Sequence, residues 1–137
     1  MHTISTFLFS DAQNLNRERI FGQVRLYFDG WENVEFNEVS RPFGKAAALR
    51  VVVDGKYDFT VSYIDDEGIR ESLLYVERMT ATKFPAEKLV CEVRTNFGDD
   101  KDGDFDEVTI SMYAFLEALP CALVYDDNQK KIVSNRI

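Results

Sequence analysis

The side chains best spaced for chemistry are the carboxylates of residues 99–107, with the sequence DDKDGDFDE. Six acids and one base give this acidic run a net charge of −5, more than half of the chain's −8. Clustered carboxylates suit either a hard cation such as calcium or a basic protein partner. The acids of the run are Asp99, Asp100, Asp102, Asp104, Asp106 and Glu107.

The spacing of the acidic run argues against a calcium loop. An EF-hand loop requires glycine at its sixth position and glutamate at its twelfth. Aligning Gly103 with the sixth position places Thr109 at the twelfth, and aligning Asp100 with the first places Phe105 at the sixth. We therefore expect neither a metal nor a cofactor here.

A basic protein is the partner that we expect for the acidic run. Clustered carboxylates accelerate encounter with a cationic protein and reject acidic ones. Further acids could support such docking, and tryptophan is enriched at the centres of interfaces. These supporting residues are Asp65, Asp66, Glu67, Asp126, Asp127 and Trp31. The alternative is a solvated loop whose last two acids lie favourably at a helix N-terminus.

Enzymatic chemistry finds little support among the residue types. His2 is the one histidine, near a chain end of the kind that is usually mobile, so no Ser-His-Asp or Cys-His site can be assembled. Cys91 and Cys121 lack the spacing of a zinc ribbon or redox pair. Gly98 and Gly103 lie among acids, which would repel phosphate. We expect a protein that is not an enzyme.

The composition restricts the partners and the compartment. A net charge of −8 argues against direct binding to nucleic acid or to an anionic membrane. No segment approaches the roughly 20 apolar residues that span a bilayer, and the start of the sequence lacks the pattern of a secretory signal. We expect a cytoplasmic protein in which Cys91 and Cys121 are buried thiols, although a disulfide between them is left open.

The first half of the chain shows both strand and helix patterns. Residues 3–9 predict a strand, and Ser10 with Gln13 forms a capping-box pattern before a helix that extends to Phe28. A hairpin turning at residues 29–30 is the less favoured alternative. Residues 31–39 alternate as a half-exposed strand, and residues 48–64 predict a β-hairpin that turns at Asp54-Gly55. Its aromatic residues are expected in the core.

The second half is less uniform. Residues 69–79 fit both a strand and a helix, and the neighbouring strands favour the strand. A short helical turn after Pro85, a strand over 89–97, a helix over 108–119 that ends at Pro120, and a final hairpin follow.

These elements predict one α+β domain over residues 1–137, a single-layer antiparallel sheet of meander and hairpin type with two or three helices packed on one face. Small acidic domains without catalytic residues are typically binders, and a nuclease must be basic to hold phosphates. Our leading hypothesis is an immunity or antitoxin-type inhibitor of a basic protein. Alternatives are a small-molecule binder or carboxylate-based enzyme with an aromatic-lined pocket, a nucleic-acid mimic that disables a defence enzyme, and a secretion chaperone or adaptor.

Overall fold

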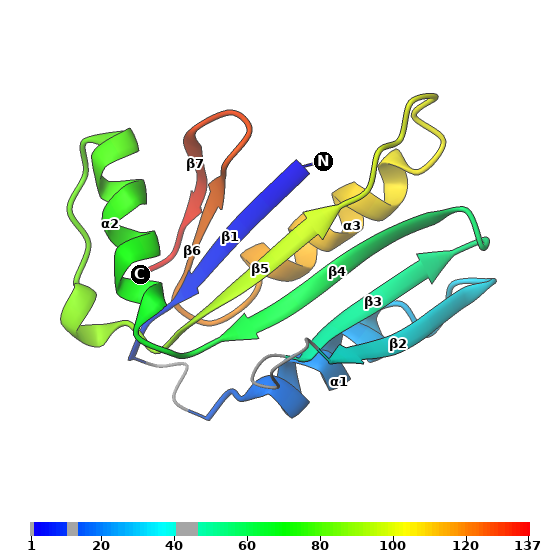
Figure 1. Cartoon of the computed structure of the whole chain (residues 1–137), viewed down its shortest axis with the longest axis horizontal. Coiled ribbons are helices and arrows are strands. Elements are labelled where there is room, and N and C mark those ends of the chain that lie inside the picture. The colour runs from blue at the N-terminus through cyan, green and yellow to red at the C-terminus, as the bar shows by residue number, and fades with distance from the viewer. Residues whose placement is uncertain (1, 11–13, 41–46) are drawn as a thin grey trace.

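A seven-stranded antiparallel sheet dominates the computed structural model, which describes residues 2–10, 14–40 and 47–137 (Figure 1). The strands are β1 (His2–Leu8), β2 (Val34–Ser40), β3 (Ala47–Val53), β4 (Tyr57–Ile64), β5 (Cys91–Phe97), β6 (Ala122–Asp126) and β7 (Lys131–Asn135). The helices are α1 (Arg17–Tyr27), α2 (Gly68–Thr80), the short 3-10 helix η2 (Ala86–Lys88) and α3 (Asp106–Glu117). The predicted α+β class is confirmed.

The order of the strands is less simple than the expected meander. They follow one another as β2-β3-β4-β5-β1-β6-β7, so β1 lies between β5 and β6 and pairs antiparallel with both. The seven strands therefore form a larger sheet than the predicted meander. Strand β1, the first of the described strands along the chain, joins the group β2–β5 to the hairpin β6–β7.

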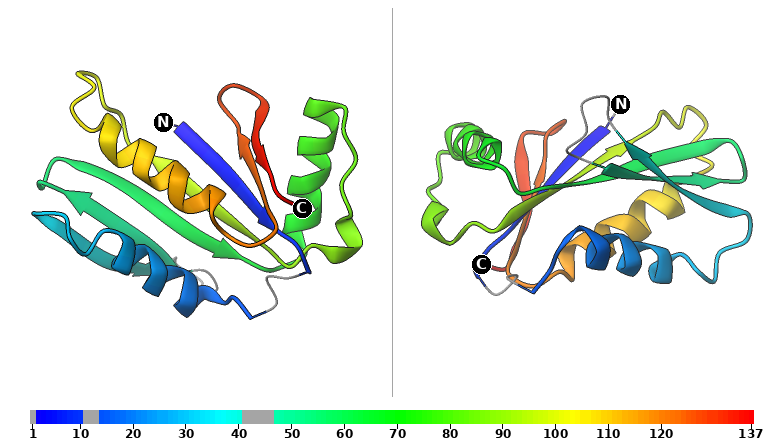
Figure 2. Two further views of the ribbon diagram at one scale, coloured as in Figure 1. Left: turned by 180° about the vertical axis from the view of Figure 1, so that it is seen from behind. Right: turned by 60° about the horizontal axis from the view of Figure 1, so that its bottom comes forward.

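The helices divide between the two faces of the sheet, as Figure 2 shows. Helices α1 and α3 pack on one face, where the main core is built on Ile4, Phe59 and Val93 from three strands. Helix α2 packs on the other face, where Leu73 and Val76 meet Phe7 and other apolar side chains in a smaller cluster. Two helices thus share one face as expected, and the third covers the opposite face.

The Asp54-Gly55 hairpin is confirmed in detail. Asp54 and Gly55 are the central residues of a turn closed by a hydrogen bond from the backbone N–H of Lys56 to the carbonyl of Val53 at 3.1 Å, and both have positive φ, 56° and 64°. Strands β3 and β4 pair from Val53 opposite Tyr57, and the predicted faces point into the main core. The final hairpin is also confirmed, with β6 paired to β7.

The predicted strand over residues 69–79 is wrong, because this segment is helix α2. Alternation along the sequence permitted a strand, but the side chains buried in the structure are Ile69, Leu73 and Val76, which recur every three or four residues. Leu73 and Val76 pack against the second face of the sheet, on which α2 is the only α-helix among the described residues.

The beginning of α1 also differs from the prediction. Its N-cap is Asn16, whose side-chain oxygen accepts a hydrogen bond from the backbone N–H of Arg19 at 2.9 Å, and not Ser10. Gln13, the other half of the predicted capping box, lies outside the described residues. The helix ends at Tyr27, so the alternative hairpin over this segment is excluded.

The two cysteines point to opposite faces of the sheet. Cys91 is a free thiol in the main core, and Cys121 lies against the smaller cluster, so no disulfide joins them. Burial raises the pKa of the Cys91 thiol to about 12. No helix in the described part of the chain is long and apolar enough to cross a membrane.

Candidate functional site

The acidic run forms a folded loop between β5 and α3, at the right-hand side of Figure 1. The carboxylate of Asp100 accepts a hydrogen bond from the backbone N–H of Phe105 at 2.9 Å, and its carbonyl accepts one from Gly103 at 3.2 Å. Gly103 has a φ of 71°, a conformation that glycine adopts at little cost. Asp100 is thus a structural residue that closes the loop, and the carboxylates of its neighbours are left exposed.

Phe105 attaches this loop to the sheet. Its ring stacks on that of Tyr57 at the start of β4, and Tyr57 is itself buried in the main core. Burial raises the pKa of Tyr57, which the carboxylate of Asp100 raises further. The acidic run is therefore held on a rigid element.

A groove of about 280 Å³ brings part of the acidic run next to Trp31. Asp104 and Glu107 line it from the loop and from α3, and Glu32 and Asp54 line it from the opposite side. The sequence predicted Trp31, Asp104 and Glu107 as separate binding residues, and the structure brings them together. It adds Glu32, in the loop between α1 and β2, and Asp54, in the turn between β3 and β4. Both are far from the acidic run in sequence, so only the folded structure shows that they lie next to it.

Trp31 is half-buried in this groove. Its ring meets that of Phe28 edge to face, with centroids 5.3 Å apart, and part of the side chain packs against the main core. The remainder lines the groove among carboxylates. Trp31 is therefore partly a core residue and partly a surface residue.

A second groove, of about 390 Å³, lies on the other side of the Tyr57–Phe105 stack. It is lined by Asp99, Asp100 and Asp106, and His2 is also part of its wall. Together the two grooves and the exposed loop form one surface, which we call the acidic end. It consists of Trp31, Glu32, Asp54, Asp99, Asp100, Asp102, Asp104, Asp106 and Glu107.

The predicted supporting acids 65–67 do not belong to the acidic end. They follow Ile64, which pairs with Glu92 near the start of β5, whereas the acidic run follows the other end of that strand. Asp66 accepts a hydrogen bond at 2.9 Å from the backbone N–H of Gly68, the first residue of α2. The structure separates these acids from the run by the length of β5.

Asp126 has an internal role and does not line a docking surface. It is 1% exposed, and one carboxylate oxygen lies 3.0 Å from the hydroxyl of Tyr113 and 3.2 Å from Nε2 of His2. The other accepts hydrogen bonds from the backbone N–H groups of Asn128 and Gln129. Burial alone would raise the pKa of Asp126, but these contacts lower it.

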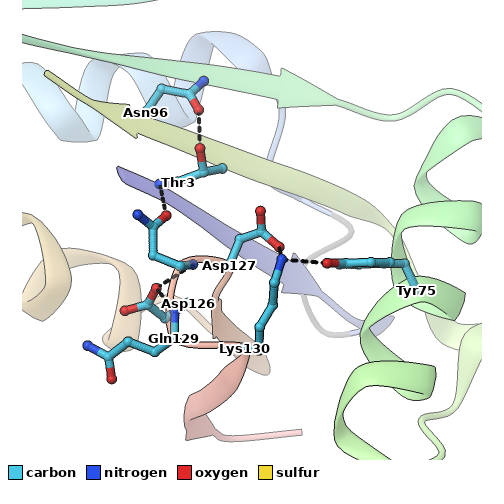
Figure 3. Close-up of polar contacts among 8 residues, drawn as sticks. Thr3, Tyr75, Asn96, Asp126, Asp127, Gln129 and Lys130 are labelled. Carbon is cyan, nitrogen blue, oxygen red and sulfur yellow. Dashed lines mark hydrogen bonds and ion pairs between the residues drawn. The ribbon is translucent and has the colours of Figure 1, made fainter. Parts of the chain in front are cut away.

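Asp127 is likewise engaged within the chain. Its carboxylate lies 2.9 Å from Nζ of Lys130, which also donates a hydrogen bond to the Tyr75 hydroxyl at 2.6 Å (Figure 3). The β6–β7 turn is thereby attached to α2, and the pKa of Lys130 rises through the bond to Tyr75 and the pairing with Asp127.

His2 is part of the sheet, whereas its position near the chain end had predicted a mobile residue. It belongs to β1, pairs with Phe97 in β5, and contacts Asp126 and Tyr113. The period-two alternation of residues 4, 6 and 8, extended by two positions, would have placed His2 on the core face.

Within the described residues, no group of three or more histidine, cysteine, aspartate or glutamate side chains is arranged to hold a metal ion. Of the aromatic residues of β4 that a ligand pocket would have used, Tyr57 and Phe59 are buried in the main core, and Tyr63 is partly buried against it with its hydroxyl hydrogen-bonded to the carbonyl of Leu15. Comparison with family models, curated proteins and solved structures finds no match to this chain. The acidic end remains the surface at which the acidic run and Trp31 converge.

Proposed function

We propose that this chain is a small acidic binding protein of the immunity or antitoxin type, which inhibits a basic protein by docking on it through the acidic end. The observation that carries the proposal is the convergence of Trp31 with Asp104 and Glu107 in one groove, beside a loop fixed by Phe105. An aromatic anchor surrounded by carboxylates matches a partner that presents lysine and arginine around an apolar contact.

The fixed loop favours such docking for a thermodynamic reason. A mobile acidic segment would lose conformational entropy on binding, whereas this loop is already held by the Asp100–Phe105 hydrogen bond and the Tyr57 stack. Its exposed carboxylates attract a basic partner over a distance of about 8–10 Å at physiological salt. A nuclease, whose active surface is basic because it holds phosphates, is the partner class that this surface would block.

The distribution of charge favours this proposal over nucleic-acid mimicry. A mimic needs carboxylates in rows along an extended face. Here the acids gather at one end, and the carboxylates of two strands further along the sheet are neutralised in the ion pairs Arg50–Asp58 and Arg94–Glu92, the second of which has a buried carboxylate.

The test is a triple charge reversal with a matched control. Asp102→Lys, Asp104→Lys and Glu107→Lys change exposed side chains and spare Asp100, which closes the loop. The control, Asp65→Lys, Glu67→Lys and Glu87→Lys, makes the same change in net charge at exposed positions outside the acidic end. Thermal unfolding of both variants verifies that each is folded.

Wild type and both variants are used as bait in native lysate at low and high salt, and the retained proteins are identified by mass spectrometry. We expect wild type and control to retain the same basic protein, released by salt, and the acidic-end variant to lose it. Direct titration of that protein should show inhibition of its activity by the wild-type chain. Retention by all three baits, or a captured protein that is acidic, would contradict the proposal.

A further inference from the structure

A larger groove, of about 570 Å³, lies on the face of the sheet opposite to α1 and α3. Helix α2 forms one wall, and strands β5, β1 and β6 form the floor. Its polar lining includes Ser5, Glu71, Ser72, Tyr75, Arg94 and Tyr125. This groove shares no residue with the acidic end, so a ligand bound here occupies a separate site.

Arg94 is held in the groove by a fully buried carboxylate. Glu92 is 0% exposed and accepts hydrogen bonds from Nε of Arg94 at 3.0 Å and from Nη2 at 3.1 Å. Nη2 also reaches the hydroxyl of Ser72 at 3.4 Å. The two bonds to Glu92 fix the orientation of the guanidinium. Within the described residues Nη1 makes no hydrogen bond, so its two N–H donors remain available.

The floor of the groove adds a buried hydroxyl without a partner. Ser5 pairs with Arg94 on one side and with Tyr125 on the other, so the three side chains form a row across three strands. Tyr125 is 1% exposed, and burial, with Tyr75 nearby, raises its pKa. Its hydroxyl nevertheless meets no group with hydrogen-bond geometry in the described part of the chain. A buried hydroxyl in this state calls for a ligand or an ordered water.

The charges of the groove determine the kind of ligand that fits. Arg94 is neutralised by Glu92, and Asp127 by Lys130, whose contact with Tyr75 is visible in Figure 3. Glu71 is exposed and has no ion pair within the described residues. The groove therefore offers guanidinium donors and a separate carboxylate acceptor, and its acids oppose a doubly charged anion such as phosphate.

We propose that this groove binds a small zwitterion that carries a carboxylate and an amino group, as a free amino acid or a short peptide does. The ligand carboxylate accepts hydrogen bonds from Nη1 of Arg94, the amino group pairs with Glu71, and Tyr125 supplies a further hydrogen bond. Arginine suits this role because its planar fork binds carboxylates with defined geometry.

The binding test is a titration of the isotope-labelled full chain followed by its backbone amide resonances. The probes are the twenty free amino acids and short alanine peptides, with N-acetylated and C-amidated forms of the best ligand, inorganic phosphate and glucose for comparison. We expect a zwitterion to shift the resonances of Ser5, Ser72 and Arg94, and either blocked form to bind about tenfold more weakly or worse. The peptides and the free amino acids distinguish the two sources of the ligand.

Variants identify the groups that bind. Glu71→Gln and Tyr125→Phe preserve size and should weaken binding, whereas Glu87→Gln, an exposed change outside the groove, should leave it unchanged. Arg94→Lys retains a positive charge beside the buried Glu92, and its folding can be verified from the same spectra. The proposal is overturned if no zwitterion shifts these resonances, if blocked and free forms bind equally, if phosphate or glucose binds in their place, or if Glu71→Gln binds as wild type does.

Discussion

The ring of Phe105 lies 5.0 Å from that of Tyr57, centroid to centroid, with the two planes inclined by only 10°. This stack joins the most highly charged segment of the chain to the hairpin that the sequence predicted most clearly. Repulsion among the neighbouring carboxylates opposes a compact loop, and the apolar contact opposes that repulsion.

Replacing Phe105 with alanine should lower the free energy of unfolding by about 1–3 kcal/mol, because a half-buried ring and its stacking partner are lost. Urea unfolding measures the change. Phe105→Leu keeps most of the apolar contact and should cost less. If the alanine variant were as stable as wild type, Phe105 would not attach the loop to the sheet.

Neighbouring leucines of α2 should respond very differently to truncation. Leu73 is 1% exposed and Leu74 is 42% exposed, although they are adjacent. Leu73→Ala should lower the free energy of unfolding by about 2–4 kcal/mol, and Leu74→Ala by about 0.5 kcal/mol or less. Denaturant unfolding of the two variants provides the comparison. Equal losses would show that α2 does not present the face that the structure gives it.

Asp126 should make the protein sensitive to acid. Its pKa is lower in the folded state than in the unfolded chain, so the unfolded state binds more protons and stability rises with pH through this window. The stabilisation is complete above the ordinary aspartate pKa of about 3.9 and is lost as the pH falls through the lower pKa of the folded state.

Asp126→Asn is therefore expected to be less stable than wild type at neutral pH, by about 1–3 kcal/mol, since hydrogen bonds to a buried carboxylate are weakened. The difference should shrink as the pH is lowered below about 4. Free energies of unfolding measured along a pH series test this. Asp102→Asn, an exposed change in the acidic run, serves as the control, and a difference that stayed constant with pH would contradict the assignment.

Cys91 should be inert to alkylation in the folded protein. A pKa of about 12 lowers the thiolate fraction near neutral pH by about a thousandfold relative to a thiol with the ordinary value, and the side chain is fully buried. The measurement is the rate of iodoacetamide labelling in the Cys121→Ser variant, which leaves Cys91 as the one thiol. Labelling in native buffer as fast as in urea would show that Cys91 is accessible.

Local sequence patterns were sufficient to predict many of the helices and hairpins. The Asp54-Gly55 turn, the final hairpin and the helix before Pro120 depend on residues that are close in sequence, and all three were predicted. Helix α2 was not, because its apolar residues satisfy two periodicities and only the face of the sheet that it covers decides between them. The position of β1 depends on pairing with distant strands, which one sequence does not reveal.

The candidate site was predicted only in part, because it too combines a local sequence feature with long-range contacts. The acidic run is local and was visible in the sequence. Its grouping with Trp31 and Asp54 depends on how three loops meet at one end of the sheet. Asp126 was mistaken for a surface acid because nothing near it in sequence shows that His2 and Tyr113 enclose it.

The place of β1 also has a consequence for how the protein forms. Of the described strands, β1 comes first along the chain, yet its partners β5 and β6 come more than eighty residues later. The β2–β5 strands can associate beforehand, but they join the β6–β7 hairpin only through β1. Because such long-range closure slows folding, we expect assembly to stall with an apolar strand exposed, and refolding to be slow and prone to aggregation.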